Sequence, residues 1–248
     1  MPDAGEGFNS VAPLRTVHEL GTLITRLQNR APGLAGMGCL SGWSGFGKTS
    51  AALWATNRFG CVNVQVQSSW SAKFFCERVL IELGERAPRG TVGSMVSQIT
   101  EMLAIRDTPL LIDEADYLMK KRAIEIVRDI YEGSQVPVIL IGEEKMPVKL
   151  AQWDRIHNRV GGWAQAQEAL LEEVHLLARI YAPGIEIDDA LAKLIHKGSR
   201  KNFRRICTNL SELREISLVL NKTFLTREDW GDREVFAGVH PDARAEPS

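Results

Sequence analysis

The segment that most constrains the fold of this 248-residue chain is a glycine-rich loop, Gly42-Trp43-Ser44-Gly45-Phe46-Gly47-Lys48-Thr49. It fits the pattern G-x-x-x-x-G-K-[ST]. The apolar run 37–40 precedes it as a buried strand would, and residues 51–54 continue as a helix that we expect to end near Gly60. A strand, a glycine-rich loop and a helix N-terminus in this order form a cradle for phosphate groups, because the backbone N–H groups and the helix dipole both attract an anion. The loop therefore predicts a nucleotide-binding α/β domain.

Two side chains of this loop, hereafter the P-loop, carry specific expectations. Lys48 is expected to contact the β and γ phosphates of ATP, and the Thr49 hydroxyl to bind Mg²⁺. A glycine-rich turn that binds nothing is the alternative, and the strand and helix beside the loop favour nucleotide binding. The residues expected to hold the nucleotide are Gly42, Ser44, Gly45, Phe46, Gly47, Lys48, Thr49 and Ser50.

A second motif supplies the carboxylates that this chemistry needs. The short apolar strand 109–112 ends in Asp113 and Glu114. Strands that neighbour the P-loop strand end beside the bound phosphates. Asp113 is therefore expected to hold Mg²⁺, directly or through water, and Glu114 to orient and deprotonate the attacking water. An acidic helix start is the alternative. Residues 113–116 spell the letters D-E-A-D of RNA helicases, but those enzymes need two large α/β domains and this chain has room for one.

The order of elements predicts the fold class. Apolar strands at 37–40, 61–66, 109–112 and 136–141 alternate with helices, which indicates an α/β fold with a parallel sheet covered by helices on both faces. Thr16 is expected to cap a helix that runs to about Arg30. Beyond about residue 165 only helices are expected, at 168–181, 188–197 and 202–221, with a last short one at 226–230. We expect an N-terminal arm (1–15), a nucleotide-binding domain (16–165), a small all-helical domain (166–225) and a C-terminal tail (226–248).

Composition excludes several classes of protein. The net charge of −1 means that nucleic-acid binding would rest on local basic patches. No run is long and apolar enough to cross a bilayer, and no secretory signal is visible, so we expect a cytoplasmic protein that does not bind membranes. The four cysteines lie far apart and are expected to be free thiols rather than metal ligands.

One α/β nucleotide domain followed by a small helical domain resembles the AAA+ ATPases, over roughly residues 10–225. The resemblance implies that the helical domain is a lid over the nucleotide, that the active site lies between subunits, and that an arginine finger and two sensors complete it. In the segment 149–160, Arg159 resembles the finger that reaches the γ-phosphate of a neighbouring subunit, and Arg155 is the second choice. A solvated helix face is the alternative reading of both arginines.

The resemblance also locates the two sensors. The first usually carries Asn, Thr or Ser after the fourth strand, whereas here Gly142 is followed by Glu143. A carboxylate near the γ-phosphate repels it unless protonated or turned away, so we expect slow hydrolysis. Arg200, Lys201 and Arg204 all qualify as the second sensor.

Among AAA+ proteins, the chain most resembles the small ATPases of DNA transposition: the phage Mu B protein and the TnsC and TniB group. The cues are residues 37–49, the polar stretch 67–71, residues 110–116 and the compact lid. Mu B carries an extra N-terminal DNA-binding domain for which the residues ahead of the P-loop are too few. The resemblance implies that ATP-bound subunits form a helical filament around duplex DNA and present it to a transposase, and that hydrolysis disassembles the filament.

Basic residues near these elements are the candidate DNA contacts, with plain surface charge as the alternative. They are Lys73, Arg78, Lys120, Lys121 and Arg122. Three other functions remain open: a replication-initiation or helicase-loading ATPase of the Orc/Cdc6 kind, an ExeA-like secretion ATPase, and a nucleotide-switched scaffold that does not hydrolyse ATP. The first would normally add a winged-helix domain, and the second membrane or wall-binding segments.

Overall fold

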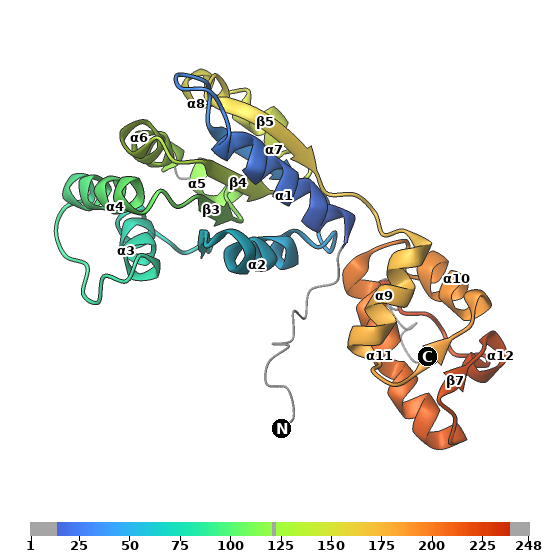
Figure 1. Cartoon of the computed structure of the whole chain (residues 1–248). Coiled ribbons are helices and arrows are strands. Elements are labelled where there is room, and N and C mark those ends of the chain that lie inside the picture. The colour runs from blue at the N-terminus through green and yellow to red at the C-terminus, as the bar shows by residue number, and fades with distance from the viewer. Residues whose placement is uncertain (1–13, 121–122, 239–248) are drawn as a thin grey trace, which may run out of the picture. The chain divides into compact units, whose positions relative to one another are not determined.

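A computed structural model describes residues 14–120 and 123–238 of the chain. It divides into two compact units, one formed by Arg15–Gln167 and the other containing the residues from Glu168 onward (Figure 1). Most of the predicted N-terminal arm, the end of the predicted tail, and the DNA-contact candidates Lys121 and Arg122 lie outside the described residues. None of the helices in the described part of the chain has the length and apolarity that a bilayer crossing requires.

The first unit is built on a five-stranded parallel sheet in the order β2-β3-β4-β1-β5. Its strands are β1 (Met37–Ser41), β2 (Val62–Gln65), β3 (Leu110–Asp113), β4 (Val138–Gly142) and β5 (Val160–Gln165). The three inner strands are buried along their whole length, which explains why each reads as a continuous apolar run. Because all strands are parallel, their C-terminal ends lie along the same side of the sheet. The P-loop follows β1 on this side, and Asp113 and Gly142 are the last residues of β3 and β4.

Helices cover both faces of this sheet (Figure 1). They are α1 (Arg15–Gln28), α2 (Lys48–Phe59), α3 (Ala72–Glu82), α4 (Val92–Arg106), α5 (Asp116–Lys120), α6 (Ile124–Ser134), α7 (Met146–Leu150) and α8 (Asp154–His157). Alternate residues of β1 face the two layers. Met37 and Cys39 are buried in the core that contains the apolar residues of α3, α4 and α6. Gly38 faces α1, where an added Cβ would lie 2.8 Å from Leu27.

The predicted fold class is confirmed: this is an α/β P-loop fold with a parallel sheet, followed by a helical region. The fifth strand, β5, was not predicted, because its sequence Val-Gly-Gly-Trp-Ala-Gln has no apolar run. Its glycines permit close packing: a Cβ at Gly161 would lie 2.2 Å from the carbonyl oxygen of Ala35, and one at Gly162 2.5 Å from Leu23.

The expectation that Thr16 caps a helix is wrong. Helix α1 already includes Arg15, so Thr16 lies inside its first turn. The Thr16 hydroxyl is buried and donates a hydrogen bond of 3.0 Å to the carbonyl oxygen of Phe46 in the P-loop. Thr16 therefore ties α1 to the P-loop instead of satisfying a helix end.

The second unit is mainly helical, with α9 (Leu171–Tyr181), α10 (Asp189–Gly198), α11 (Phe203–Leu220) and α12 (Arg227–Trp230). Asp188 and Asn202 cap α10 and α11 by accepting hydrogen bonds from Leu191 N (2.7 Å) and Arg205 N (3.3 Å). A parallel pair of two-residue strands, β6 (Glu186–Ile187) and β7 (Phe224–Leu225), interrupts the helices, where the sequence predicted helices only. Such short strands carry no periodic signal that a sequence reading can detect.

Candidate nucleotide-binding site

The P-loop backbone has the conformation that its glycines allow. Gly45 and Gly47 have φ angles of 82° and 79°, in the left-handed region that other residues rarely adopt. Gly47 is the N-cap of α2 and provides no side-chain cap. The first hydrogen bond of the helix runs from Ala51 N to Gly47 O (2.9 Å), so the N–H groups of residues 48–50 precede it and point out of the helix end. This end of α2 is suited to an anion.

Lys48 lies folded back on the P-loop. Its ammonium group donates hydrogen bonds to the carbonyl oxygens of Gly42 (2.6 Å) and Trp43 (2.9 Å). Burial lowers the pKa of Lys48, and the carboxylates of Glu114 and Asp113 oppose this effect. The P-loop thus holds a cation at its mouth, beside two carboxylates.

Thr49 and Asp113 come together from α2 and β3. The Thr49 hydroxyl donates to Oδ2 of Asp113 (2.8 Å), and Oδ1 of Asp113 accepts from Glu114 N (2.9 Å). Asp113 is only 2% exposed, and burial raises its pKa. A hydroxyl and a carboxylate side by side fit Mg²⁺, which takes few protein ligands and completes its shell with phosphate oxygens and water. The described residues contain no group of three His, Cys, Asp or Glu that could hold a metal by itself.

Glu114 occupies a left-handed backbone conformation, with φ of 56°, which a non-glycine residue adopts only when its surroundings impose it. Burial raises the pKa of Glu114, and the negative charge of Asp113 raises it further. A half-buried carboxylate with a raised pKa, next to the proposed magnesium ligands, is suited to accept a proton from water.

Glu143, the residue at the expected first-sensor position, forms an ion pair with Lys149. Its carboxylate is 65% exposed and lies 2.9 Å from the ammonium group of Lys149, whose charge lowers the pKa of Glu143. The same ammonium lies 2.5 Å from Oδ1 of Asp116, which is 3% exposed and whose Oδ2 accepts from Glu143 N (2.7 Å). The sequence reading missed Lys149 and Asp116. Asp116 is the last residue of the D-E-A-D segment, and this segment was the one signal that could have drawn attention to it. Nothing in the sequence indicated that Asp116 pairs with Lys149.

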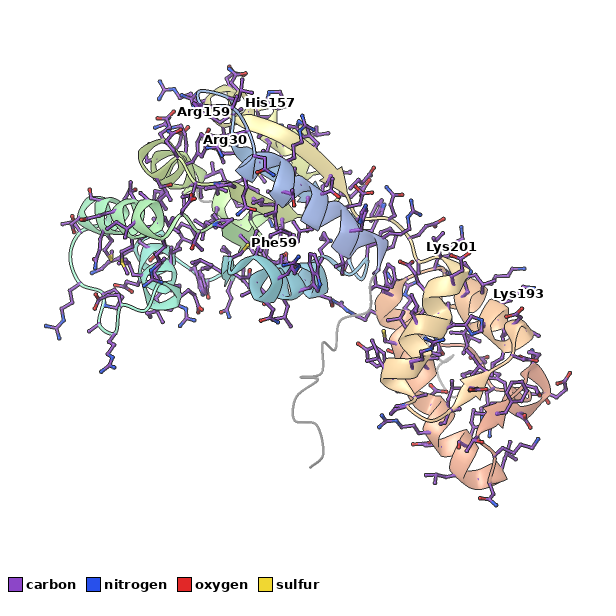
Figure 2. The ribbon with its side chains drawn as sticks, viewed as in Figure 1. Arg30, Phe59, His157, Arg159, Lys193 and Lys201 are labelled. Atoms are coloured by element: carbon purple, nitrogen blue, oxygen red, sulfur yellow. The ribbon has the colours of Figure 1, made fainter. Side chains whose placement is uncertain are left out.

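Arg155 and Arg159 lie at the N-terminal ends of the strands, whereas the P-loop lies at their C-terminal ends. Arg159 O accepts from Met37 N (3.0 Å) at the start of β1, whereas the P-loop follows the end of β1, roughly 16 Å farther along the strand. Figure 2 shows Arg159 at the end of the unit where β5 begins. The Arg159 guanidinium pairs with Glu132 (Nε to Oε1, 2.6 Å) and donates to Arg155 O (3.0 Å). Arg155 is exposed, and its side chain forms no ion pair with another described residue.

The second-sensor candidates lie in the helical unit: Arg200 and Lys201 between α10 and α11, and Arg204 at the start of α11. Arg200 and Lys201 both have left-handed φ angles, 51° and 55°, and Arg204 is exposed in the first turn of α11. Lys201 pairs with Glu168 at 2.5 Å. Lys193 and Lys201 are labelled in Figure 2. A cavity of about 540 Å³ is lined by Glu168, Lys193, His196, Lys197, Arg200 and Lys201.

The described DNA-contact candidates are all at the surface. Lys73 is 56% exposed and lies 3.8 Å from Glu77, and Arg78 lies 3.1 Å from Glu82 on the same helix, α3. Lys120, at the end of α5, lies over the ring of Tyr117 at 5.1 Å. The pairs on α3 are exposed and therefore weak, so both cations remain able to contact a phosphate backbone.

The chain has an AAA+-like α/β P-loop fold, and Lys48, Thr49 and Asp113 lie where such a fold would bind a nucleotide. Residues 31–150, just under half of the chain, match the family model described as AAA domain. This segment contains the P-loop, Asp113 and Glu114, and it ends before Arg155. No curated protein sequence matches the chain.

Three solved structures illustrate the likeness in fold. The ORC2 protein of Aeropyrum pernix, in its ADPNP-ADP complexes, is 12% identical at a TM-score of 0.70, and the match covers 90% of this chain and 68% of that one. The RuvB Holliday junction branch migration motor of Thermotoga maritima is 19% identical at a TM-score of 0.59, over 86% and 65%. The ORC1 protein of Aeropyrum pernix, in complex with DNA, is 16% identical at a TM-score of 0.57, over 86% and 62%. At such identities the likeness concerns the fold alone, and the chain spans about two thirds of each.

Proposed function

We propose that this protein is a magnesium-dependent ATPase whose nucleotide state controls its binding to duplex DNA. The observation that carries the ATPase proposal is the hydrogen bond of 2.8 Å between Thr49 and Asp113. It brings the two expected magnesium ligands together beside Lys48 and Glu114, at the end of a helix suited to an anion.

The chain's own residues divide the chemistry among them. Lys48 exchanges the carbonyl oxygens of Gly42 and Trp43 for phosphate oxygens. Glu114 takes a proton from water, whose oxygen bonds to the γ-phosphorus while the bond to the bridging oxygen breaks, which yields ADP and inorganic phosphate. Thr49 and Asp113 would hold Mg²⁺, which would supply positive charge beside the phosphates.

ATP binding is proposed to join copies of the chain. Arg155 and Arg159 lie at the N-terminal ends of the strands, away from the P-loop of their own unit. Either arginine can therefore contribute to a phosphate site only through another copy. Of the two, Arg155 is exposed, whereas Arg159 already pairs with Glu132. A γ-phosphate held between copies would make assembly depend on ATP.

DNA is proposed as the partner because the similar structures include a branch migration motor and an ORC1 protein bound to DNA. Lys73, Arg78 and Lys120 are the described candidates for phosphate contacts, and a net charge of −1 requires such local contacts to be repeated over several copies. The likeness to ORC proteins supports a role in replication initiation or helicase loading more than one in transposition. Delivery of target DNA to a transposase rests on the sequence resemblance alone.

The test is electron microscopy and filter binding of the full chain with duplex DNA and a non-hydrolysable ATP analogue. We expect ordered assemblies on DNA with the analogue, and none with ADP or in Lys48→Ala. If the protein binds ATP but stays a monomer and does not bind DNA at low salt, the DNA proposal is wrong. The ATPase proposal is not affected by that result.

Substitutions that remove positive charge test which surface binds DNA. Lys73→Ala combined with Lys120→Ala should weaken DNA binding about tenfold or more and reduce its salt dependence. Arg86→Ala combined with Arg89→Ala removes two exposed charges beyond the other end of α3 and serves as the matched control. Equal losses in both proteins would mean that total charge, and not this surface, governs binding.

A further inference from the structure

A lysine from outside the expected motifs lies between two carboxylates at the edge of the sheet that carries the P-loop. The Lys149 ammonium, on α7, lies 2.5 Å from Oδ1 of Asp116 and 2.9 Å from Oε2 of Glu143. Both carboxylates raise the pKa of Lys149 and so keep it charged, although burial acts in the opposite direction. We call these three residues the Lys149 cluster.

The register of the sheet places the Lys149 cluster beside the phosphate end of the P-loop. Ser41 pairs with Gly142 at the ends of β1 and β4, so Gly42 and Glu143 directly follow two paired residues on strands about 4.8 Å apart. The Gly42 carbonyl oxygen is the one that accepts from Lys48 at 2.6 Å. Lys48 is the residue expected at the β and γ phosphates. The carboxylates of the cluster therefore lie near the position expected for the phosphates.

Packing holds Asp116 in this position. A Cβ added to Gly142 would lie 2.2 Å from Oδ2 of Asp116 and 2.3 Å from the sulfur of Met146. The Asp116 carboxylate also accepts a hydrogen bond from Glu143 N at 2.7 Å, which favours this position. Neutralisation of its charge falls to Lys149, whose side chain is 34% exposed and thus reachable from the site.

The charge balance shows why this cation matters. Asp113, Glu114, Asp116 and Glu143 all act on the charge of Lys48, so four carboxylates share one small region. Lys48 and Lys149 oppose them, and Lys120 acts on Glu143 as well. Without Lys149, Asp116 and Glu143 would both lose their ion-pair partner, and a ligand with an added phosphate would be repelled most, because that phosphate lies nearest to them.

We propose that Lys149 sets the preference of the site for ATP over ADP, by neutralising Asp116 and Glu143 beside the position of the γ-phosphate. This inference rests on the nucleotide binding proposed above. It also changes the role expected for Glu143, because the ion pair with Lys149 weakens the repulsion between Glu143 and the γ-phosphate without removing it.

The experiment measures the affinities of the full chain for Mg-ADP and for a non-hydrolysable Mg-ATP analogue. Lys149→Met should weaken binding of the ATP analogue about tenfold more than binding of ADP. Lys149→Arg should retain the preference, and Glu143→Gln in the Lys149→Met background should restore most of it. Lys145→Met removes an exposed lysine from the N-cap of the same helix, and should change the ratio of the two affinities less than about twofold.

Glu143→Gln alone keeps the test decisive if Lys149→Met fails to fold. The Glu143 side chain is mostly exposed, so this variant should fold normally and raise the preference for ATP severalfold. Equal losses of ATP and ADP affinity in folded Lys149→Met, or no change of the ratio in Glu143→Gln, would overturn the role of Lys149. A wild-type protein that binds neither nucleotide would overturn the proposed function itself.

Discussion

The hydroxyl of Thr49, at the start of α2, lies 2.8 Å from Oδ2 of Asp113, at the end of β3. The two residues are 64 positions apart in the chain. They meet because β1 and β3 are both neighbours of β4 and all three strands are parallel. A hydroxyl oxygen and a buried carboxylate oxygen at this distance are the pair through which the proposed reaction depends on Mg²⁺.

The first prediction concerns this pair. Thr49→Val has nearly the shape of threonine but no oxygen, so Mg²⁺ affinity should fall roughly 10- to 100-fold. Thr49→Ser keeps the oxygen and should stay close to wild type. Titration of Mg²⁺ in an ATP hydrolysis assay checks both variants. Wild-type metal dependence in Thr49→Val would show that Thr49 is not a ligand.

The second prediction separates hydrolysis from binding. Glu114→Gln keeps the size of the side chain but cannot accept a proton, so the hydrolysis rate should fall roughly 10²- to 10⁴-fold. Nucleotide affinity should stay within a few fold of wild type, because Lys48 and the P-loop N–H groups are untouched. Single-turnover hydrolysis and equilibrium ATP binding are the two measurements. Undiminished turnover would place the base elsewhere.

Four of the five main strands could be predicted: β1, β3 and β4 because burial on both faces demands continuous apolar runs, and β2 because its buried valines alternate with polar residues. The ranges 37–40, 61–66, 109–112 and 136–141 fall on β1, β2, β3 and β4 within a residue or two. Strand β5 could not be predicted, because it depends on close packing against α1, which its glycines allow. A constraint of that kind exists only once the fold is assembled.

The candidate site shows the same division. Lys48, Thr49, Asp113 and Glu114 could be proposed from their motifs, since motif spacing on parallel strands implies proximity. The partner of Glu143 could not be proposed. Lys149 reaches Glu143 and Asp116 only because a short helix, α7, returns beside the end of β4. No local pattern in the sequence encodes that meeting.

The third prediction tests sharing of the site between copies. Arg155→Ala and Arg159→Ala each lack one candidate finger, and the variant that removes the true finger should lose about 10²-fold or more of the hydrolysis rate. Mixing it with Lys48→Ala, which has a damaged P-loop but both arginines, should restore activity. Glu132→Gln is the control for Arg159, because it breaks the ion pair and leaves the arginine in place. If mixing restores nothing with either arginine variant, the site does not work in trans.

The fourth prediction concerns stability and uses two glycines. Gly142→Ala would force a Cβ to within 2.2 Å of the Asp116 carboxylate, so it should lower the free energy of unfolding by about 1–3 kcal/mol. Gly93 lies near the start of α4 with nothing within 4 Å of an added Cβ. Gly93→Ala should raise the free energy of unfolding by about 0.4–1 kcal/mol. Urea denaturation of both variants provides the comparison, and a stable Gly142→Ala would mean that Asp116 is not packed against β4.

The fifth prediction concerns the four cysteines, all of which are free and three of which are buried. Burial raises the pKa of the thiol of Cys39, and it raises that of Cys61 to about 12 and that of Cys76 to about 11. Cys207 is half-buried, and burial raises its pKa as well. Only the thiolate reacts with disulfide reagents, and a raised pKa makes it scarce below that pKa: at pH 8 a thiol of pKa 12 is about 10⁻⁴ ionised.

The native protein should therefore react slowly with an aromatic disulfide reagent at pH 8, and the rate should rise with pH through 10. Denaturant should expose four reactive thiols, because unfolding returns each pKa to its ordinary value. Cys207→Ser serves as the control, since Cys207 is the least buried of the four and should supply the first reacting thiol. Fast reaction of two or more thiols in the folded protein would show that the core around β1 and α3 opens readily.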